Sequence, residues 1–325
     1  MSTPTTAPAA AGPGTMKAAR VHRFGPPDVI VLEDVPRPVP GDGEVLVRVG
    51  AAGVGPWDGW IRAGKSALPQ PLPLTLGSDL SGVVVEGGGA AAAFAAGDAV
   101  FGVTNPRFIG AYAEYAVASA GMVARRPASL TDVEAASVPV VAVTAWQALF
   151  DQAHLSRGDA VLIHGAAGNV GSYAVQFARA AGLRIAASGK AADVARLHRL
   201  GADQVIDVQG EQFEEKVGQL DAVVDLVGGD LQARSFSVLK PGGVLISTVS
   251  EPDQNAAKRH GVTAHFFLVE VTTTRLEAIA AMLEASDLRT SVGAVLPLAA
   301  ARDAHEMLDG IRPRPHGKIV LRVAE

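Results

Sequence analysis

The sequence predicts an α/β protein in which a mostly-β lobe is followed by a doubly wound parallel sheet, and three observations support this fold class. Short apolar runs separated by Gly and Pro clusters occupy residues 16–137, where helical periodicity is weak. Strand and helix signals alternate after Pro139, as in repeated βα units with a parallel sheet. A length of 325 residues gives room for two domains, each with a core of its own.

Composition and charge exclude several classes of function. The formal charge is -5, and no Lys/Arg stripe interleaved with aromatics indicates a nucleic-acid partner. No apolar run approaches the roughly 20 residues that cross a bilayer, so we expect a soluble cytoplasmic protein without a membrane partner. The chain has no cysteine, which removes disulfides, thiolate nucleophiles and every Cys-ligated zinc site. No metal is expected.

The first lobe is predicted from short β-like runs. Examples are residues 44–49, 82–86 and 98–101. A last apolar run at residues 317–323 is expected to rejoin this lobe as a strand. The expected division is a disordered tail over residues 1–15, a first domain over residues 16–137 and 273–325, and a second domain over residues 138–272.

The second lobe is predicted from repeated strand and helix signals. Strands are expected near residues 160–163, 183–187, 203–206, 222–225 and 243–247, with a further helix over 272–284. Gly182 and Gly201 stand where the first two helices would end in a left-handed residue. Such alternation implies parallel strands joined by crossover helices.

A small-residue turn between Val161 and Gly171 indicates the function. Ala166, Gly168 and Gly171 have the spacing of a GxGxxG turn between a strand and a helix. Gly168 lets the backbone approach a pyrophosphate, and Gly171 lets the helix pack closely on the strand. The helix N-terminus would face the negative charge. We therefore predict a Rossmann dinucleotide site contacted by the turn and the first helical residues, Ala166, Gly168, Asn169, Val170 and Gly171.

The end of the second strand indicates which nicotinamide cofactor is preferred. An NAD site usually places Asp or Glu there to hold the ribose hydroxyls. This chain has no carboxylate in that stretch before Asp193, and Ser188 and Lys190 could instead receive a 2′-phosphate. The residues therefore favour NADPH. The alternative is that Lys190 is an ordinary solvated lysine.

Several motifs in one order resemble the medium-chain dehydrogenase/reductase superfamily, and specifically its zinc-independent quinone oxidoreductase-like branch. The resemblance covers nearly all of the chain from Met16 to Val323. The segments that carry it include Gly41-Asp-Gly-Glu-Val-Leu-Val47, Gly77-Ser-Asp-Leu-Ser-Gly82, Gly97-Asp-Ala-Val100, Gly110-Ala-Tyr-Ala-Glu-Tyr115, Val143-Thr-Ala-Trp146, His164-Gly-Ala-Ala-Gly168 and Gly317-Lys-Ile-Val-Leu321.

The resemblance implies a GroES-like mostly-β catalytic domain, a Rossmann NADP-binding domain, and often a homodimer. It also implies hydride transfer from NADPH to a small-molecule quinone or α,β-unsaturated carbonyl. Thr144 and Asp58 match positions near the reacting groups, although Gly55 stands where the family usually has Asn. Further expected cofactor contacts are Val227, Phe267 and Lys318. The expected substrate pocket comprises Trp57, Trp60 and Phe266.

Three alternatives stay open at this stage. Trp57 and Trp60 could stack on a planar substrate or simply fill the core of their lobe. An enoyl-thioester reductase would need a basic pocket for a coenzyme A phosphate, for which Arg312 and Arg314 are candidates. A non-catalytic NADPH-binding sensor is the third alternative, because the family's Asn and a nearby Tyr are missing beside Asp58. His164 ends the first Rossmann strand, where a packing role is more common than that of an acid.

Overall fold

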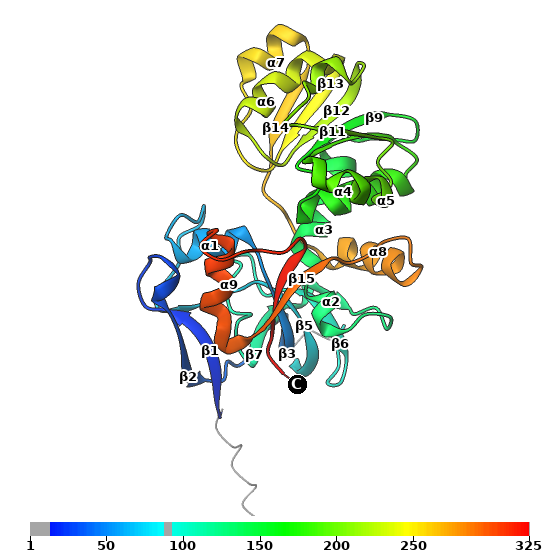
Figure 1. Cartoon of the computed structure of the whole chain (residues 1–325). Coiled ribbons are helices and arrows are strands. Elements are labelled where there is room, and N and C mark those ends of the chain that lie inside the picture. Colours follow the sequence, from blue (N-terminus) through cyan, green and yellow to red (C-terminus); the bar gives the residue numbers. More distant parts are fainter. Residues whose placement is uncertain (1–13, 88–92, 325) are drawn as a thin grey trace, which may run out of the picture.

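The computed structural model describes residues 14–87 and 93–324, which form two lobes (Figure 1). The expected tail over residues 1–15 lies mostly outside the described part. The predicted end of the tail at residue 15 is wrong, because Thr15 already belongs to the first strand, where it pairs with Pro36. No helix within the described residues combines the length and the apolar character that crossing a bilayer requires.

The mostly-β lobe contains two sheets. A three-stranded sheet has the order β2-β1-β4, formed by β1 (Thr15–Val21), β2 (Ile30–Pro36) and β4 (Leu74–Thr75). A larger sheet has the order β15-β16-β3-β5-β6-β8, with β7 also paired to β3. Its strands are β3 (Glu44–Val54), β5 (Asp79–Gly87), β6 (Ala99–Val103), β7 (Tyr115–Ser119), β8 (Val123–Arg125), β15 (Val292–Pro297) and β16 (Lys318–Arg322).

Burial supports the assignment of the central strand of this lobe. Every residue of β3 from Val45 to Val54 is buried except Arg48 and Gly50, so most of this strand is covered on both faces. The C-terminal strand β16 pairs antiparallel with β3, so the end of the chain rejoins the first lobe as predicted. Helices α2 (Asp132–Ala135) and α9 (Ala301–Leu308) contact strands of these sheets, and α1 (Pro56–Arg62) contacts α9.

The second lobe contains a parallel sheet, as predicted, with six strands rather than the five that were expected. Its order is β11-β10-β9-β12-β13-β14, and every paired strand runs parallel. The strands are β9 (Ala160–His164), β10 (Arg184–Gly189), β11 (Gln204–Asp207), β12 (Leu220–Asp225), β13 (Leu239–Ser247) and β14 (Thr263–Phe266). When the strands are numbered along the chain from β9, this order is 3-2-1-4-5-6. The direction in which successive strands are added to the sheet reverses between β9 and β12.

Helices cover both faces of the parallel sheet. They are α4 (Asn169–Ala180), α5 (Val194–Leu200), α6 (Gly229–Ser235) and α7 (Gln254–His260). Val161 and Ile163 of β9 pack in one hydrophobic cluster with Phe177 of α4, whereas Leu162 packs in a second cluster with Phe236. The sheet is therefore buried on both faces, as a doubly wound fold requires.

Two helices lie between the lobes. Helix α3 (Pro139–Trp146) lies between the two sheets in Figure 1, and its side chains join the cluster that packs on β9. Helix α8 (Thr273–Glu284) contacts both α3 and β8. Because α8 contacts both lobes, the domain boundary between residues 272 and 273 stays a prediction.

Candidate active site

The turn after β9 has the shape that a dinucleotide requires. Gly165 adopts a left-handed φ of 71°, and the N–H of Gly168 donates to the carbonyl of Gly165 at 2.9 Å. A Cβ on Gly171 would lie 2.4 Å from the oxygen of Gly165 and 2.6 Å from Cα of Ala166. Only glycine fits at residue 171, so the turn and helix α4 approach as closely as the sequence pattern predicted.

The turn lies beside the loop that follows β12. A Cβ on Gly165 would be 3.0 Å from Cγ2 of Val227, whose side chain is 48% exposed. Phe267 follows β14, and its N–H donates to the carbonyl of Ser247 at the end of β13. Since these strands are parallel, the turn, Val227, Phe266 and Phe267 all lie at the carboxyl edge of the sheet, where such folds bind ligands.

Ser188 does not face a cofactor, which corrects one of the predicted contacts. Its side chain is 1% exposed, and its hydroxyl lies 2.8 Å from Nδ1 of His164. The carbonyl of Ser188 accepts a hydrogen bond from the N–H of Ala166. The serine therefore ties the end of β10 to the turn. Lys190, two residues later, is exposed and forms no ion pair with the described residues.

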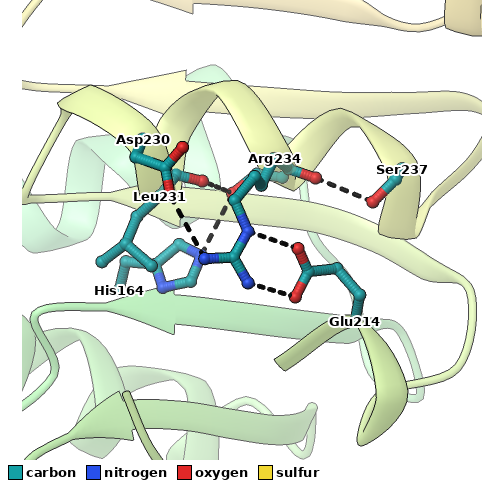
Figure 2. Close-up of polar contacts among 7 residues, drawn as sticks. His164, Glu214, Asp230, Leu231, Arg234 and Ser237 are labelled. Carbon is teal, nitrogen blue, oxygen red and sulfur yellow. Dashed lines mark hydrogen bonds and ion pairs between the residues drawn. The ribbon is translucent and has the colours of Figure 1, made fainter. Parts of the chain in front are cut away.

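His164 is a packing residue. Its Nε2 lies 3.1 Å from the hydroxyl of Ser235, and burial lowers the pKa of the imidazole to about 4. Figure 2 shows the ring next to Arg234, whose guanidinium donates to both carboxylate oxygens of Glu214 at 2.5 and 2.6 Å. A neutral, fully buried imidazole fits the structural role favoured from the sequence rather than that of an acid.

Asp58 lies beneath the surface of the first lobe rather than in contact with solvent. Its Oδ2 accepts hydrogen bonds from the N–H of Gly55 at 2.8 Å and from the hydroxyl of Tyr112 at 3.0 Å. The side chain is fully buried, and desolvation raises its pKa to about 7. This placement corrects the expectation of a directly catalytic Asp58, because a group that touches a substrate needs an accessible atom.

Lys318 is also buried, which corrects its predicted contact with the cofactor. Its Nζ lies 2.7 Å from Oδ2 of Asp79, and Oδ1 of Asp79 accepts from the N–H of Val140 at the start of α3. The same ammonium lies 4.3 Å from the centre of the Trp57 ring. Lys318 therefore supports Trp57 and connects strand β16 to β5 and α3.

Gly55 and Trp57 have complementary shapes. A Cβ on Gly55 would lie 2.3 Å from the Trp57 ring, so the indole occupies the space of a side chain at residue 55. Trp57 is half-buried, and its Nε1 donates to the hydroxyl of Ser78 at 2.9 Å. Trp60 is 51% exposed and, with Lys65 and Leu308, lines a separate surface pocket of about 380 Å³. The two tryptophans therefore have different surroundings.

Thr144 lies on α3, one turn after Val140. Its hydroxyl donates to the carbonyl of Val140 at 2.7 Å, and 7% of the residue remains exposed. The N–H of the same Val140 is held by Asp79. The position of Thr144 is thus fixed through Asp79 and Lys318, and a small part of its surface is available to a ligand.

Two contacts near the turn escaped the sequence analysis. Nη1 of Arg196 in α5 donates to the carbonyl of Ala167 at 2.7 Å. Nε2 of His316, from the first lobe, lies 3.5 Å from Oδ1 of Asp193, in the second. The only feature of the sequence that could have indicated these contacts is the presence of two charged residues, Asp193 and Arg196, shortly after Lys190.

The structure also bears on a coenzyme A phosphate and a metal ion as alternative ligands. Arg312, a candidate for a coenzyme A phosphate, is paired with Glu306 at 2.5 Å and with Asp303 at 3.1 Å. Within the described residues, no three His, Asp or Glu side chains converge as a metal site would require.

Comparisons with known proteins agree with this architecture. The alcohol dehydrogenase GroES-like domain family matches residues 41–128, and the zinc-binding dehydrogenase family matches residues 200–321. The quinone oxidoreductase of Homo sapiens is 33% identical over 314 residues, which are 91% of this chain and 95% of the relative.

Solved structures show the same likeness. The quinone oxidoreductase from Coxiella burnetii superposes with a TM-score of 0.88 at 33% identity, covering 96% of this chain and 100% of the other. A mycobacterial relative complexed with NADPH has a TM-score of 0.84 at 30% identity, covering 94% of this chain and 99% of its own. The mostly-β lobe is a GroES-like domain, and the chain belongs to the medium-chain dehydrogenase/reductase superfamily, in its quinone oxidoreductase-like branch.

Proposed function

We propose that this chain is an NADPH-dependent oxidoreductase that reduces a quinone or an α,β-unsaturated carbonyl without zinc. The observation that carries the proposal is the turn after β9, where a Cβ on Gly171 would collide with backbone atoms of Gly165 and Ala166. A turn this close to its helix, at the point where the strand order reverses, fits a dinucleotide. The family of the chain supports an oxidoreductase that uses NAD(P)H.

The cofactor would be held by backbone and by one cation. Free N–H groups at the start of α4, around Asn169 and Val170, suit the pyrophosphate, because they carry the positive end of the helix dipole. Exposed Lys190 suits the 2′-phosphate. Val227 and Phe267 provide apolar surface at the same edge of the sheet. When bound, NADPH supplies the hydride.

The acceptor would lie between Thr144 and the half-buried face of Trp57. Both side chains are fixed through the buried pair Lys318–Asp79. Their contribution is to orient a planar acceptor, to exclude water and, through the Thr144 hydroxyl, to hydrogen-bond the oxygen that gains negative charge. Asp58 would keep α1 in place rather than move a proton, and the final proton would come from solvent.

The ligands that the chain offers support zinc independence. Family members that polarise a substrate with zinc use Cys and His, and this chain has no cysteine. The described residues contain no converging group of His, Asp and Glu that could replace it. We also propose that the protein is a cytoplasmic homodimer. Sedimentation of the purified protein would determine its oligomeric state.

The test measures oxidation of NADPH and of NADH with a panel of quinones, enones and an enoyl-thioester in the presence of a metal chelator. We expect turnover that resists the chelator and prefers NADPH. Lys190→Ala should weaken NADPH much more than NADH, while Lys258→Ala, an exposed lysine on α7, serves as the matched control. Equal losses for both cofactors would refute the 2′-phosphate assignment, and tight NADPH binding without turnover would favour the sensor alternative.

A further inference from the structure

The end of β10 and helix α5 both approach Ala167, in the middle of the dinucleotide turn. Nη1 of Arg196 donates to the carbonyl of Ala167 at 2.7 Å. A Cβ built on Gly189 would lie 3.9 Å from Cβ of Ala167 and 3.0 Å from Cδ1 of Leu197. Gly189 directly precedes Lys190, and Leu197 directly follows Arg196. The end of β10 and helix α5 therefore lie beside the turn, and a cation adjoins each of them: Lys190 follows β10, and Arg196 belongs to α5.

Neither Lys190 nor Arg196 forms an ion pair with the other described residues. The nearest carboxylate in sequence, Asp193, is 5% exposed and faces His316 of the first lobe. Arg196 is half-buried, so its guanidinium is held in place with only part of its hydration. A fixed arginine beside a phosphate-binding turn is poised for an anion.

We propose that Arg196 is the second cation of the 2′-phosphate site and a determinant of the preference for NADPH over NADH. The inference rests on the proposed function, because it concerns the same cofactor. Such folds place the adenosine ribose at the end of the second strand, where an arginine can receive the 2′-phosphate. Here that strand is β10, which ends at Gly189.

The two cations would act differently. Arg196 has one N–H committed to Ala167, which fixes the direction of the planar fork and leaves other N–H groups for a phosphate oxygen. Because the fork is already oriented, little side-chain entropy is lost when the phosphate binds. Lys190 is exposed, and it adds a point charge on a flexible side chain.

A purely structural role for Arg196 makes a different prediction. An arginine that only braces the turn would affect every adenine nucleotide alike, because the turn holds the part that they share. An arginine that binds the 2′-phosphate would affect only nucleotides that carry this group. The pair 2′,5′-ADP and 5′-AMP separates the two roles, since they differ by the 2′-phosphate alone.

The experiment titrates the full-length protein with 2′,5′-ADP and with 5′-AMP by calorimetry. The variants are Arg196→Gln, Arg196→Lys and the control Arg199→Gln, which alters an exposed arginine on the same helix. We expect Arg196→Gln to weaken 2′,5′-ADP by about 10- to 100-fold, as for loss of a hydrogen bond to a charged group. Binding of 5′-AMP should stay nearly constant, Arg196→Lys should lie between, and Arg199→Gln should match the wild type.

A measurement on the wild type covers the case in which Arg196→Gln fails to fold. Phenylglyoxal modifies accessible guanidinium groups, and peptide mass spectrometry reports its extent at Arg196. We expect 2′,5′-ADP to protect Arg196 and 5′-AMP to leave it reactive. Equal protection by both nucleotides would overturn the proposal.

The outcomes also separate this inference from the proposed function. If the wild type binds 2′,5′-ADP no more tightly than 5′-AMP, the preference for NADPH fails and this inference fails with it. If the wild type discriminates and Arg196→Gln keeps that discrimination, only the role of Arg196 is overturned. An equal loss for both nucleotides would assign Arg196 to bracing the turn and would likewise overturn the proposal.

Discussion

Replacing Lys318 by Met tests whether the buried ion pair with Asp79 maintains the site. The ammonium and the carboxylate are 2.7 Å apart, and their side chains are 1% and 0% exposed. Removing one partner of such a pair leaves the other charge buried, which typically costs about 3–5 kcal/mol of folding free energy. We expect Lys318→Met to lose an amount in this range at pH 8.

The loss should depend on pH in a defined direction. Burial already raises the pKa of Asp79, and Lys318 is the main group that opposes this rise. Without Lys318 the folded protein binds the Asp79 proton still more tightly than the unfolded chain does. The stability of the variant relative to the wild type should therefore fall as pH rises above the ordinary aspartate pKa, so the loss at pH 5 should be smaller than at pH 8.

Urea unfolding at the two pH values provides the measurement. The control is Lys17→Met, because Lys17 pairs with Asp34 at the same 2.7 Å separation but with side chains 50% and 59% exposed. That surface pair should contribute less than about 1 kcal/mol. The double variant Lys318→Met/Asp79→Asn should lose less than the sum of its single variants. A Lys318→Met loss as small as that of Lys17→Met at both pH values would refute the reasoning.

Three further changes test other parts of the structure. Gly171→Ala should cost about 1–3 kcal/mol of stability and weaken the binding of NADPH, because its Cβ would meet backbone atoms. The control is Gly218→Ala, whose Cβ meets nothing within 4 Å and which should unfold at the same urea concentration as the wild type. The pKa of Asp58 is about 7 in the folded protein and 3.8 ordinarily, so the wild type should lose stability as pH rises from about 4 to 7. Asp58→Asn should remove this part of the dependence of unfolding free energy on pH, measured by urea titrations. An unaltered dependence on pH would contradict the raised pKa. Ser188→Ala should cost about 1–3 kcal/mol by leaving a His164 nitrogen unpaired, yet leave the ratio of NADPH to NADH affinity unchanged; an altered ratio in binding titrations would restore Ser188 as a cofactor contact.

Local pattern was sufficient to predict the second lobe. The alternation of apolar strands and amphipathic helices follows from residues a few positions apart, and the turn at Gly168 and Gly171 depends on the same short range. The C-termini of two helices were also predicted, since Gly182 and Gly201 adopt φ values of 73° and 116°.

One site residue was misplaced although a local signal existed. Side chains alternate along a strand, so Ser188 lies on the same face of β10 as Ala186, which packs in the cluster of Leu162. His164 ends the adjacent strand on that same face, where the serine hydroxyl reaches its ring. The alternation, extended to the end of the strand, is therefore enough to place the Ser188 side chain on the inward face.

Other features lie beyond what local pattern can predict. Lys318 and Asp79 are 239 positions apart, and only the pairing of β16 with β3 and of β3 with β5 brings them together. The fit of Trp57 into the space beside Gly55 depends on a side-chain rotamer that Ser78 and Lys318 help to fix. Such contacts depend on tertiary packing, which overrides local propensity.

Transfer of hydrogen from the cofactor to the acceptor tests the central claim most directly. The protein would be incubated, in the presence of a chelator, with an enone that it turns over and with NADPH in which both hydrogens on C4 of the nicotinamide are deuterium. The reduced product would be analysed by mass spectrometry. The account predicts a product that carries one deuterium on the carbon that accepted the hydride. A product without deuterium, or no product from any quinone or enone despite measurable NADPH binding, would contradict it.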